Sequence, residues 1–371
     1  MPQRKSSWRL WQAVPAFLSA AKSRDLAKGS ATQHRPKQFP QSARSSARST
    51  GRSVAGSEAE PEEVTPPLSP IGGVRPLVGG PGARDRGRDR HRPRPPGVDV
   101  ASSHSSRSPL QPSAASAFRL PHELHGDGPH KVIAVHGWFA DRAAFAPIVP
   151  DLDRDTFQYG FVDLRGYGEA KDVPGAYTTA EGAADVLDLA DRLGWRRFSL
   201  IGHSMGASVA QRVVAVAEER VRRLVGVSPV PASGLPLPPE QWELFSTADT
   251  RPENRRAILD VTTGGVRPAA WLDRMVRRSL ESSDAKAFRS WLDSWTGDDF
   301  HTGVEGSTVP ALAVTGQLDP ALPADLIRAT WLRWFVRGEL VDLPVCGHYA
   351  MDEAPLALIR VAEDFLRADP A

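Results

Sequence analysis

The sequence predicts an α/β fold with a mostly parallel sheet flanked by helices, and two observations carry that prediction. From about residue 116 onward, short apolar runs alternate with segments of helical periodicity, as in strands joined by crossover helices. The runs are almost continuously apolar, as expected for strands that are covered on both faces. The predicted strands are residues 132–135, 157–162, 198–201, 224–227, 311–314 and 340–343, with 118–124 as an outer strand or hairpin.

The chain joins two parts of opposite charge. Residues 1–120 hold 20 Lys and Arg against 8 Asp and Glu, whereas residues 121–371 hold 26 against 36. Residues 1–115 are rich in Ser, Arg, Pro and Gly and have too few hydrophobic residues to offset the entropy cost of ordering. We therefore predict a disordered basic extension over 1–115 and a folded domain over 116–371. The alternative is that translation starts further downstream and the extension is not made.

The extension carries no clear targeting signal. Its Arg-rich stretch, residues 84–90, suits contact with nucleic acid or an anionic membrane, but such stretches are more often solvated tails. Residues 8–21 are only mildly apolar and make a poor secretory signal. No run approaches the ~18 apolar residues of a membrane span. The one cysteine, Cys346, excludes an internal disulfide and suits a reducing compartment, so we expect the cytoplasm.

The ends of two helices are legible in the sequence. Thr178 and Glu181 form a capping box at the start of one helix. The last helix is predicted to begin near Pro355, with Asp352 and Glu353 at its positive end.

A long segment, residues 230–306, interrupts the alternation of strands and helices. It is far longer than an ordinary helix-to-strand connection, and its apolar residues recur at helical spacing. Four of the ten tryptophans fall within it. We predict a helical lid inserted over one end of the sheet.

The sharpest motif is Gly202-His203-Ser204-Met205-Gly206. It follows a predicted strand and opens a helix, which is the context that makes a G-x-S-x-G sequence a nucleophile elbow. A serine on such a strained turn stands clear of the sheet, and the two glycines avoid crowding on either side. The helix N-terminus favours the negative charge of an acyl-transfer intermediate. Ser204 is therefore the candidate nucleophile.

A serine hydroxyl needs a base, and the base needs a third group to orient it. Asp319 and His348 each follow a predicted strand, in the order Ser, acid, His. Taken singly, Asp319 is equally a turn residue before Pro320, and a lone loop histidine is more often structural. Because parallel strands present their carboxyl ends at one sheet edge, we predict that the three side chains meet as a catalytic triad.

His136-Gly137-Trp138-Phe139 follows the strand at 132–135 and supplies a candidate oxyanion loop. The backbone N–H groups of Met205 and Trp138 are the predicted donors, with that of Phe139 as the alternative. We interpret His136 as structural, with its ring bonded to nearby backbone, and His203 as a packing residue.

These motifs, with Asp163-Leu164-Arg165-Gly166-Tyr167-Gly168 and Gly347-His348, resemble the α/β-hydrolase superfamily over about residues 116–371. The closest likeness is to its lid-bearing esterase, perhydrolase-like and hydroxynitrile-lyase-like branches. The resemblance implies the α/β-hydrolase fold. It also implies that Arg165, Gly166, Tyr167 and Gly168 shape the site floor without a catalytic role.

The sequence thus predicts a serine hydrolase that cleaves a small, apolar carboxylic ester. The alternatives on the same triad are C–C bond hydrolysis, lactone opening, perhydrolysis, cyanohydrin cleavage and acyl transfer; a non-catalytic ligand-binding protein is the remote one. No metal or cofactor is expected, since no ligand cluster or G-x-G-x-x-G after a strand occurs, and no nucleic acid is expected to bind the folded domain. The expected pocket residues are Phe139, Trp242, Phe245, Trp271 and Trp291.

Overall fold

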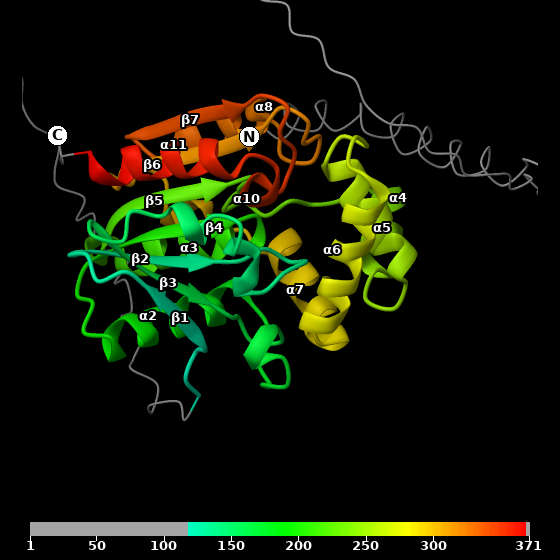
Figure 1. Cartoon of the computed structure of the whole chain (residues 1–371), viewed down its shortest axis with the longest axis horizontal. Coiled ribbons are helices and arrows are strands. Elements are labelled where there is room, and N and C mark those ends of the chain that lie inside the picture. The colour runs from blue at the N-terminus through cyan, green and yellow to red at the C-terminus, as the bar shows by residue number, and fades with distance from the viewer. Residues whose placement is uncertain (1–117, 369–371) are drawn as a thin grey trace, which may run out of the picture. The chain divides into compact units, whose positions relative to one another are not determined.

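A seven-stranded sheet forms the centre of residues 118–368, the part of the chain that the computed structural model describes (Figure 1). The spatial order is β1-β3-β2-β4-β5-β6-β7; β1 pairs antiparallel with β3, and the other pairs are parallel. The mostly parallel sheet is therefore confirmed, and the predicted extension over 1–115 lies outside the described residues. The strands are β1 (His122–His125), β2 (His130–Val135), β3 (Phe157–Val162), β4 (Phe198–His203), β5 (Val221–Val227), β6 (Ala311–Gly316) and β7 (Gly338–Leu343).

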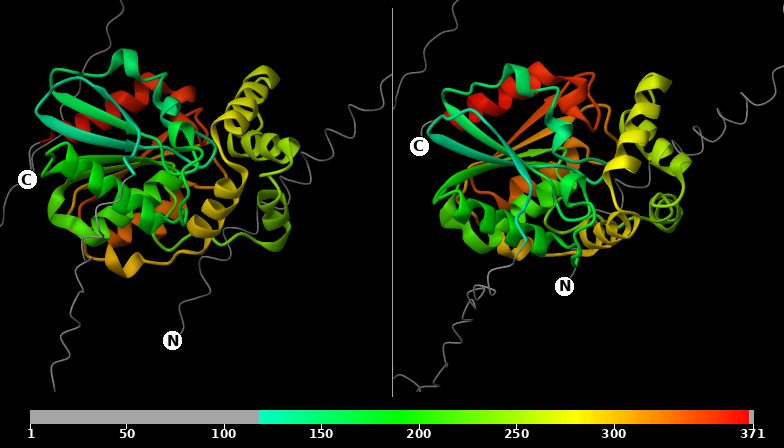
Figure 2. Two further views of the ribbon diagram at one scale, coloured as in Figure 1. Left: turned by 90° about the horizontal axis from the view of Figure 1, so that it is seen from below. Right: turned by 60° about the horizontal axis from the view of Figure 1, so that its bottom comes forward.

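Helices cover both faces of the sheet, and each face has its own buried core (Figure 2). One core includes buried residues of α2 (Thr179–Arg192), α3 (Met205–Ala217), α8 (Ala324–Ala329) and α9 (Trp331–Trp334). The other includes buried residues of α10 (Ala350–Glu353) and α11 (Pro355–Arg367). Short 3₁₀ turns complete the connections: η2 (Arg142–Phe145), η3 (Val149–Asp151), η4 (Gly168–Ala170), η5 (Glu218–Arg220) and η6 (His301–Gly303).

The predicted helix starts hold at α2 and at α11, whereas the two acidic residues before α11 lie in a helix of their own. Thr178 caps α2 by accepting a hydrogen bond from the N–H of Glu181 at 3.2 Å. Asp352 and Glu353, predicted at the start of the last helix, instead lie in the separate short helix α10, and α11 begins at Pro355. The Glu353 carboxylate bonds to the backbone of the preceding loop, which a reading of charge near a helix end does not anticipate.

The chain between β5 and β6, residues 228–310, is a helical segment that we call the insertion. Its helices lie beyond the carboxyl ends of the parallel strands, at the side of the sheet where the arrowheads point (Figure 1). None of the helices within residues 118–368 is long and apolar enough to cross a bilayer. The helices of the insertion are α4 (Pro239–Ser246), α5 (Pro252–Thr262), α6 (Ala269–Ser282) and α7 (Ala285–Gly297).

Candidate active site

Ser204 occupies a strained turn between β4 and α3. Its φ of 52° and ψ of −118° lie where non-glycine residues rarely occur. A Cβ on Gly202 would lie 2.4 Å from the Ala207 Cα, and a Cβ on Gly206 would lie 2.3 Å from the Val135 carbonyl oxygen. Both flanking positions therefore require glycine, and the turn has the geometry of a nucleophile elbow.

Asp319 and His348 form a buried hydrogen-bonded pair. The Nδ1 atom of His348 lies 2.7 Å from Oδ2 of Asp319, although the residues are 29 positions apart. The other carboxylate oxygen of Asp319 accepts a 2.9 Å bond from the N–H of Ala321. Because both carboxylate oxygens are engaged, the Asp319 side chain is fixed and can hold the imidazole in one tautomer.

Ser204 and His348 line the same cavity, at the edge of the sheet where β4 and β7 end. Each is almost fully buried, with 8% and 7% of its surface exposed. Within residues 118–368, no hydrogen bond joins the Ser204 hydroxyl to the imidazole. Nucleophile–base bonds are often long or poorly aligned without substrate and tighten when it binds.

The loop that carries His348 is tied to the insertion and to α10. The N–H of His348 donates to the carbonyl of Thr262 at 3.1 Å. The Glu353 carboxylate accepts from the N–H groups of Gly347 and Tyr349, at 2.8 Å each, and pairs with Arg267. The residues on both sides of the imidazole are thus held by one carboxylate.

The predicted oxyanion loop lies directly against the nucleophile. A Cβ on Gly137 would lie 2.6 Å from Nδ1 of His203 and 3.2 Å from Cβ of Ser204, so only glycine allows this approach. Met205 is the first residue of α3, and its N–H therefore has no partner within the helix. The N–H of Trp138 makes no hydrogen bond to another described residue. Both N–H groups are free to meet a substrate oxygen.

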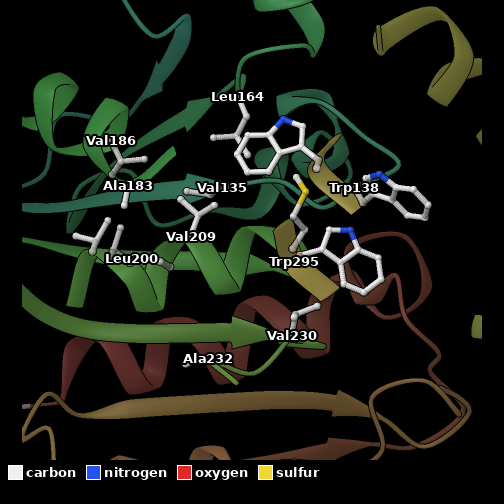
Figure 3. Packing of buried hydrophobic residues seen from close by; sticks show 14 of the residues in the cluster. Val135, Trp138, Leu164, Ala183, Val186, Leu200, Val209, Val230, Ala232 and Trp295 are labelled. Atoms are coloured by element: carbon white, nitrogen blue, oxygen red, sulfur yellow. The ribbon is translucent and has the colours of Figure 1, made fainter. Parts of the chain in front are cut away.

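The side chain of Trp138 is held by the insertion. Its indole Nε1–H donates to the carbonyl of Phe288 in α7 at 2.7 Å, and its ring stacks on Phe288 at 4.1 Å. The ring of Trp295, also in α7, lies 5.6 Å away (Figure 3). The position of the oxyanion loop therefore depends on a helix from a distant part of the chain.

The two nearby histidines are neutral and bonded to backbone groups. Nε2 of His136 accepts from the N–H of Leu164 at 3.1 Å, and its Nδ1 lies 2.8 Å from the carbonyl of Gly137. Burial lowers the pKa of His136. Burial, with a smaller effect from His348, lowers the pKa of His203 to about 3. The predicted backbone bonding of His136 is confirmed.

The cavity beside Ser204 has a volume of about 770 Å³, counting the space at its mouth. Of the predicted pocket residues, Phe139 and Phe245 line it. Its other lining residues come from the nucleophile turn, the loops after β6 and β7 and, above all, the insertion. The full lining is Trp138, Phe139, His203, Ser204, Val230, Leu235, Leu237, Gln241, Phe245, Ile258, Val261, Thr262, Trp295, Pro320, Ala321, Leu322, His348 and Tyr349.

Three predicted pocket residues do not line the cavity. Trp291 is buried below it and donates from Nε1 to the Arg165 carbonyl at 2.9 Å. Trp271 packs against Tyr349 from outside, with ring centroids 5.8 Å apart. Trp242 lies under the Arg289 guanidinium, 4.9 Å from it. Helical periodicity shows which face of a helix is covered, but not whether another helix or a cavity covers it.

Gln241 and Trp295 are cavity residues that the sequence analysis did not assign. Trp295 is one of the four tryptophans of the insertion, so its burial was expected but its place in the cavity wall was not. Gln241 gives no comparable signal, because a single glutamine beside Trp242 on a short helix reads as a solvent-facing residue. In the structure it is 97% buried, with 3% of its surface exposed.

The loop with Arg165 does not form the floor of this cavity, contrary to what the resemblance implied. Arg165 pairs with Asp185 through two hydrogen bonds of 2.7 and 3.0 Å. The carbonyl of Gly166 accepts from the N–H of Asp284 at 2.9 Å, just before α7. Tyr167 is fully buried. The loop therefore bonds to the start of α7 in the insertion and does not line the cavity beside Ser204.

Cys346 is buried, and burial raises the pKa of its thiol to about 12. A thiol with so high a pKa is a poor nucleophile. Within residues 118–368, no group of His, Cys, Asp and Glu is arranged to hold a metal ion.

Comparison with known proteins places the fold in one family. Residues 131–355, more than half of the chain, match the alpha/beta hydrolase fold family. The chain belongs to that family, and its predicted fold is confirmed.

Two curated relatives illustrate the likeness in sequence. A pimeloyl-[acyl-carrier protein] methyl ester esterase of Nitrosomonas europaea is 30% identical over 244 residues, which cover 61% of this chain and 91% of that protein. A serine hydrolase-like protein of Danio rerio is 37% identical over 122 residues, which cover 30% of this chain and only 37% of that protein.

Solved structures share the fold at lower identity. An esterase from Exiguobacterium antarcticum superposes with a TM-score of 0.61 at 18% identity, over 67% of this chain and 96% of that one. An enol-lactonase from Burkholderia xenovorans gives 0.59 at 23% identity, over 69% and 99%. At this identity the likeness concerns the fold alone.

Proposed function

We propose that this chain hydrolyses a carboxylic ester through an acyl-enzyme on Ser204. The observation that carries the proposal is the buried 2.7 Å pair of His348 and Asp319, whose imidazole opens on the same cavity as the strained serine. A serine, a histidine and a carboxylate that orients the histidine are the parts that activate a hydroxyl as a nucleophile.

The reaction proceeds in two halves. His348 takes the proton of the Ser204 hydroxyl, whose oxygen attacks the ester carbonyl carbon, and the resulting oxyanion accepts hydrogen bonds from the N–H groups of Met205 and Trp138. Protonated His348 gives its proton to the departing alcohol. Water then attacks the acyl-enzyme with His348 again as base, which releases the acid and restores Ser204. Asp319 holds the imidazole and stabilises its positive charge throughout.

The cavity favours an uncharged, mainly apolar acyl group. Its lining residues include no Lys, Arg, Asp or Glu, and most are aliphatic or aromatic. The methyl ester esterase of Nitrosomonas europaea, which aligns over 91% of its length, supports an ester as the bond that is cleaved.

The proposal is tested with a fluorophosphonate probe and p-nitrophenyl esters of short acids. The Ser204→Ala variant is expected to lose labelling and to lower turnover by roughly four to six orders of magnitude. Ser208→Ala is the matched control, because Ser208 is a buried serine of α3 that lies outside the cavity. Labelling of the native protein that persists in Ser204→Ala, or is lost in Ser208→Ala, would contradict Ser204 as nucleophile. A native protein that neither reacts with the probe nor hydrolyses esters would be a ligand-binding protein instead.

A further inference from the structure

Two hydrogen-bond donors of residues in the cavity wall have no partner among residues 118–368. Nε2 of Gln241 and Nε1 of Trp295 are enclosed, and neither donates a hydrogen bond to any described residue. Both side chains line the cavity, with 3% and 4% of their surfaces exposed. Buried donors are nearly always satisfied, because leaving one unpaired costs its full desolvation. Two unpaired donors in one wall therefore indicate a bound group that the protein itself does not supply.

The two donors belong to one patch of the wall. Gln241 and Phe245 are four positions apart on α4 and so share a face of that helix. The ring of Phe245 contacts that of Trp295 at 6.3 Å, edge to face. Gln241 and Trp295 therefore lie on either side of Phe245, where α4 meets α7.

The patch continues from the oxyanion loop. The ring of Trp138 lies 5.6 Å from that of Trp295 and 5.8 Å from that of Phe245. Figure 3 shows the Trp138 and Trp295 indoles next to each other beyond the strand ends. Phe245 and Trp295 are therefore neighbours of Trp138 in the cavity wall, and Gln241 shares the helix face of Phe245.

The chemistry of the patch specifies the missing group. An indole only donates a hydrogen bond, so the group must contain an acceptor. The cavity lining has no charged side chain to pair with a carboxylate or an ammonium, so the group is uncharged. A carbonyl oxygen is such an acceptor, and its two lone pairs would allow it to accept hydrogen bonds from both the Gln241 amide and the Trp295 indole.

We infer that Gln241 and Trp295 determine substrate specificity by binding a second carbonyl oxygen in the acyl chain, such as that of a ketone, ester or amide. The preferred substrate is then an ester of an acid that carries an uncharged oxo group beyond the reacting carbonyl. This inference rests on the proposed esterase function and names its substrate class.

The kinetic test compares p-nitrophenyl octanoate with its 5-oxo, 6-oxo and 7-oxo analogues. The native protein is expected to prefer one oxo isomer over octanoate by about tenfold or more in kcat/KM. Gln241→Met and Trp295→Phe keep most of the side-chain volume and should each reduce that ratio by about fivefold or more. Ser282→Ala, which removes an unpartnered buried hydroxyl of α6 outside the cavity, should leave the ratio unchanged. The absence of a preference at every position, or an unchanged ratio in both cavity variants, overturns the inference.

A binding test separates this inference from the proposed function. Calorimetry on Ser204→Ala measures the dissociation constants of methyl octanoate and of the methyl oxo-octanoates without turnover. The oxo ligand should bind about tenfold more tightly, and the added Gln241→Met change should abolish the difference. If the native protein neither hydrolyses octanoate nor reacts with the fluorophosphonate, the esterase proposal fails. The difference in affinity between the oxo and the plain ligand still decides whether the cavity recognises an oxo group. Equal affinities in Ser204→Ala refute the recognition even where hydrolysis is observed.

Discussion

Two tryptophans of the cavity wall provide a matched pair for measuring how strongly the insertion holds the oxyanion loop. Trp138 and Trp295 are each 4% exposed. The indole N–H of Trp138 donates a 2.7 Å bond to the Phe288 carbonyl, whereas that of Trp295 has no partner among residues 118–368. Replacing each by phenylalanine removes the same atoms but only one hydrogen bond.

The expected difference in stability follows from that bond. Phe288 lies within α7, so its carbonyl retains the helical bond from four residues ahead, and Trp138→Phe loses about 1–1.5 kcal/mol of hydrogen bonding. Trp295→Phe removes an unpaired donor and so recovers about 1 kcal/mol of desolvation cost. The ring volume lost is common to both. Trp138→Phe should therefore be less stable than Trp295→Phe by about 2 kcal/mol, or ~4–8 °C in Tm for a domain of this size.

Thermal unfolding followed by calorimetry or circular dichroism measures this difference directly. Equal melting temperatures, or a lower one for Trp295→Phe, would refute the reasoning, because the hydrogen bond from Trp138 to the Phe288 carbonyl would then give no net stabilisation. The variants should differ in turnover too, since the Trp138 side chain positions a proposed oxyanion donor. A fall in kcat with little change in KM is the signature of a donor that acts in the transition state.

Further predictions concern the proposed triad, the elbow and acid stability. Asp319→Asn should lower kcat by roughly 10⁴-fold, measured with a p-nitrophenyl ester, and a loss below tenfold would exclude its orienting role. Gly206→Ala should fail to give a soluble folded protein, because its Cβ would meet the Val135 carbonyl at 2.3 Å, whereas Gly297→Ala, with nothing within 4 Å, should melt no lower than the native protein. Burial lowers the pKa of His130 to about 4, so its folded pKa lies below the unfolded value of 6.5. Its contribution is present above pH 6.5 and lost as pH falls toward 4, at up to ~1.4 kcal/mol per pH unit; urea unfolding of His130→Gln across that window should show a shallower pH slope.

The strands and the nucleophile turn were readable from the sequence because each has a local cause. Buried parallel strands are apolar throughout, so residues 132–135 and 311–314 stand out from their surroundings. The elbow requires glycine at 202 and 206, because a Cβ there would clash with Ala207 and Val135 respectively. The two glycines lie close together in the sequence and so give a short motif. The edge strand β1 is mostly polar, as its position permits, and it lies at His122–His125 rather than at the predicted 118–124.

The cavity wall was less readable because it depends on how helices meet. Trp291 and Trp295 are four positions apart on α7 and both are buried. Trp295 lines the cavity, whereas Trp291 does not and donates to the Arg165 carbonyl instead. The same limit applies to Gln241, whose burial results from α4 packing near α7 and not from its own sequence context. Glu353 was predicted to lie at the start of the last helix, whereas it ends α10 and accepts hydrogen bonds from the N–H groups of Gly347 and Tyr349 just before that helix.

The insertion and the loop that carries His348 cannot be exchanged independently. Thr262 accepts the N–H bond of His348, and Arg267 pairs with the carboxylate that brackets this residue. A chimaera that receives the corresponding segment of a relative would keep all three residues of the proposed triad but could lose the Arg267–Glu353 pair and shift the backbone of residue 262. Recombination within such a family is therefore expected to conserve activity only when Arg267 and Glu353 are kept together and the backbone at residue 262 keeps its place beside His348.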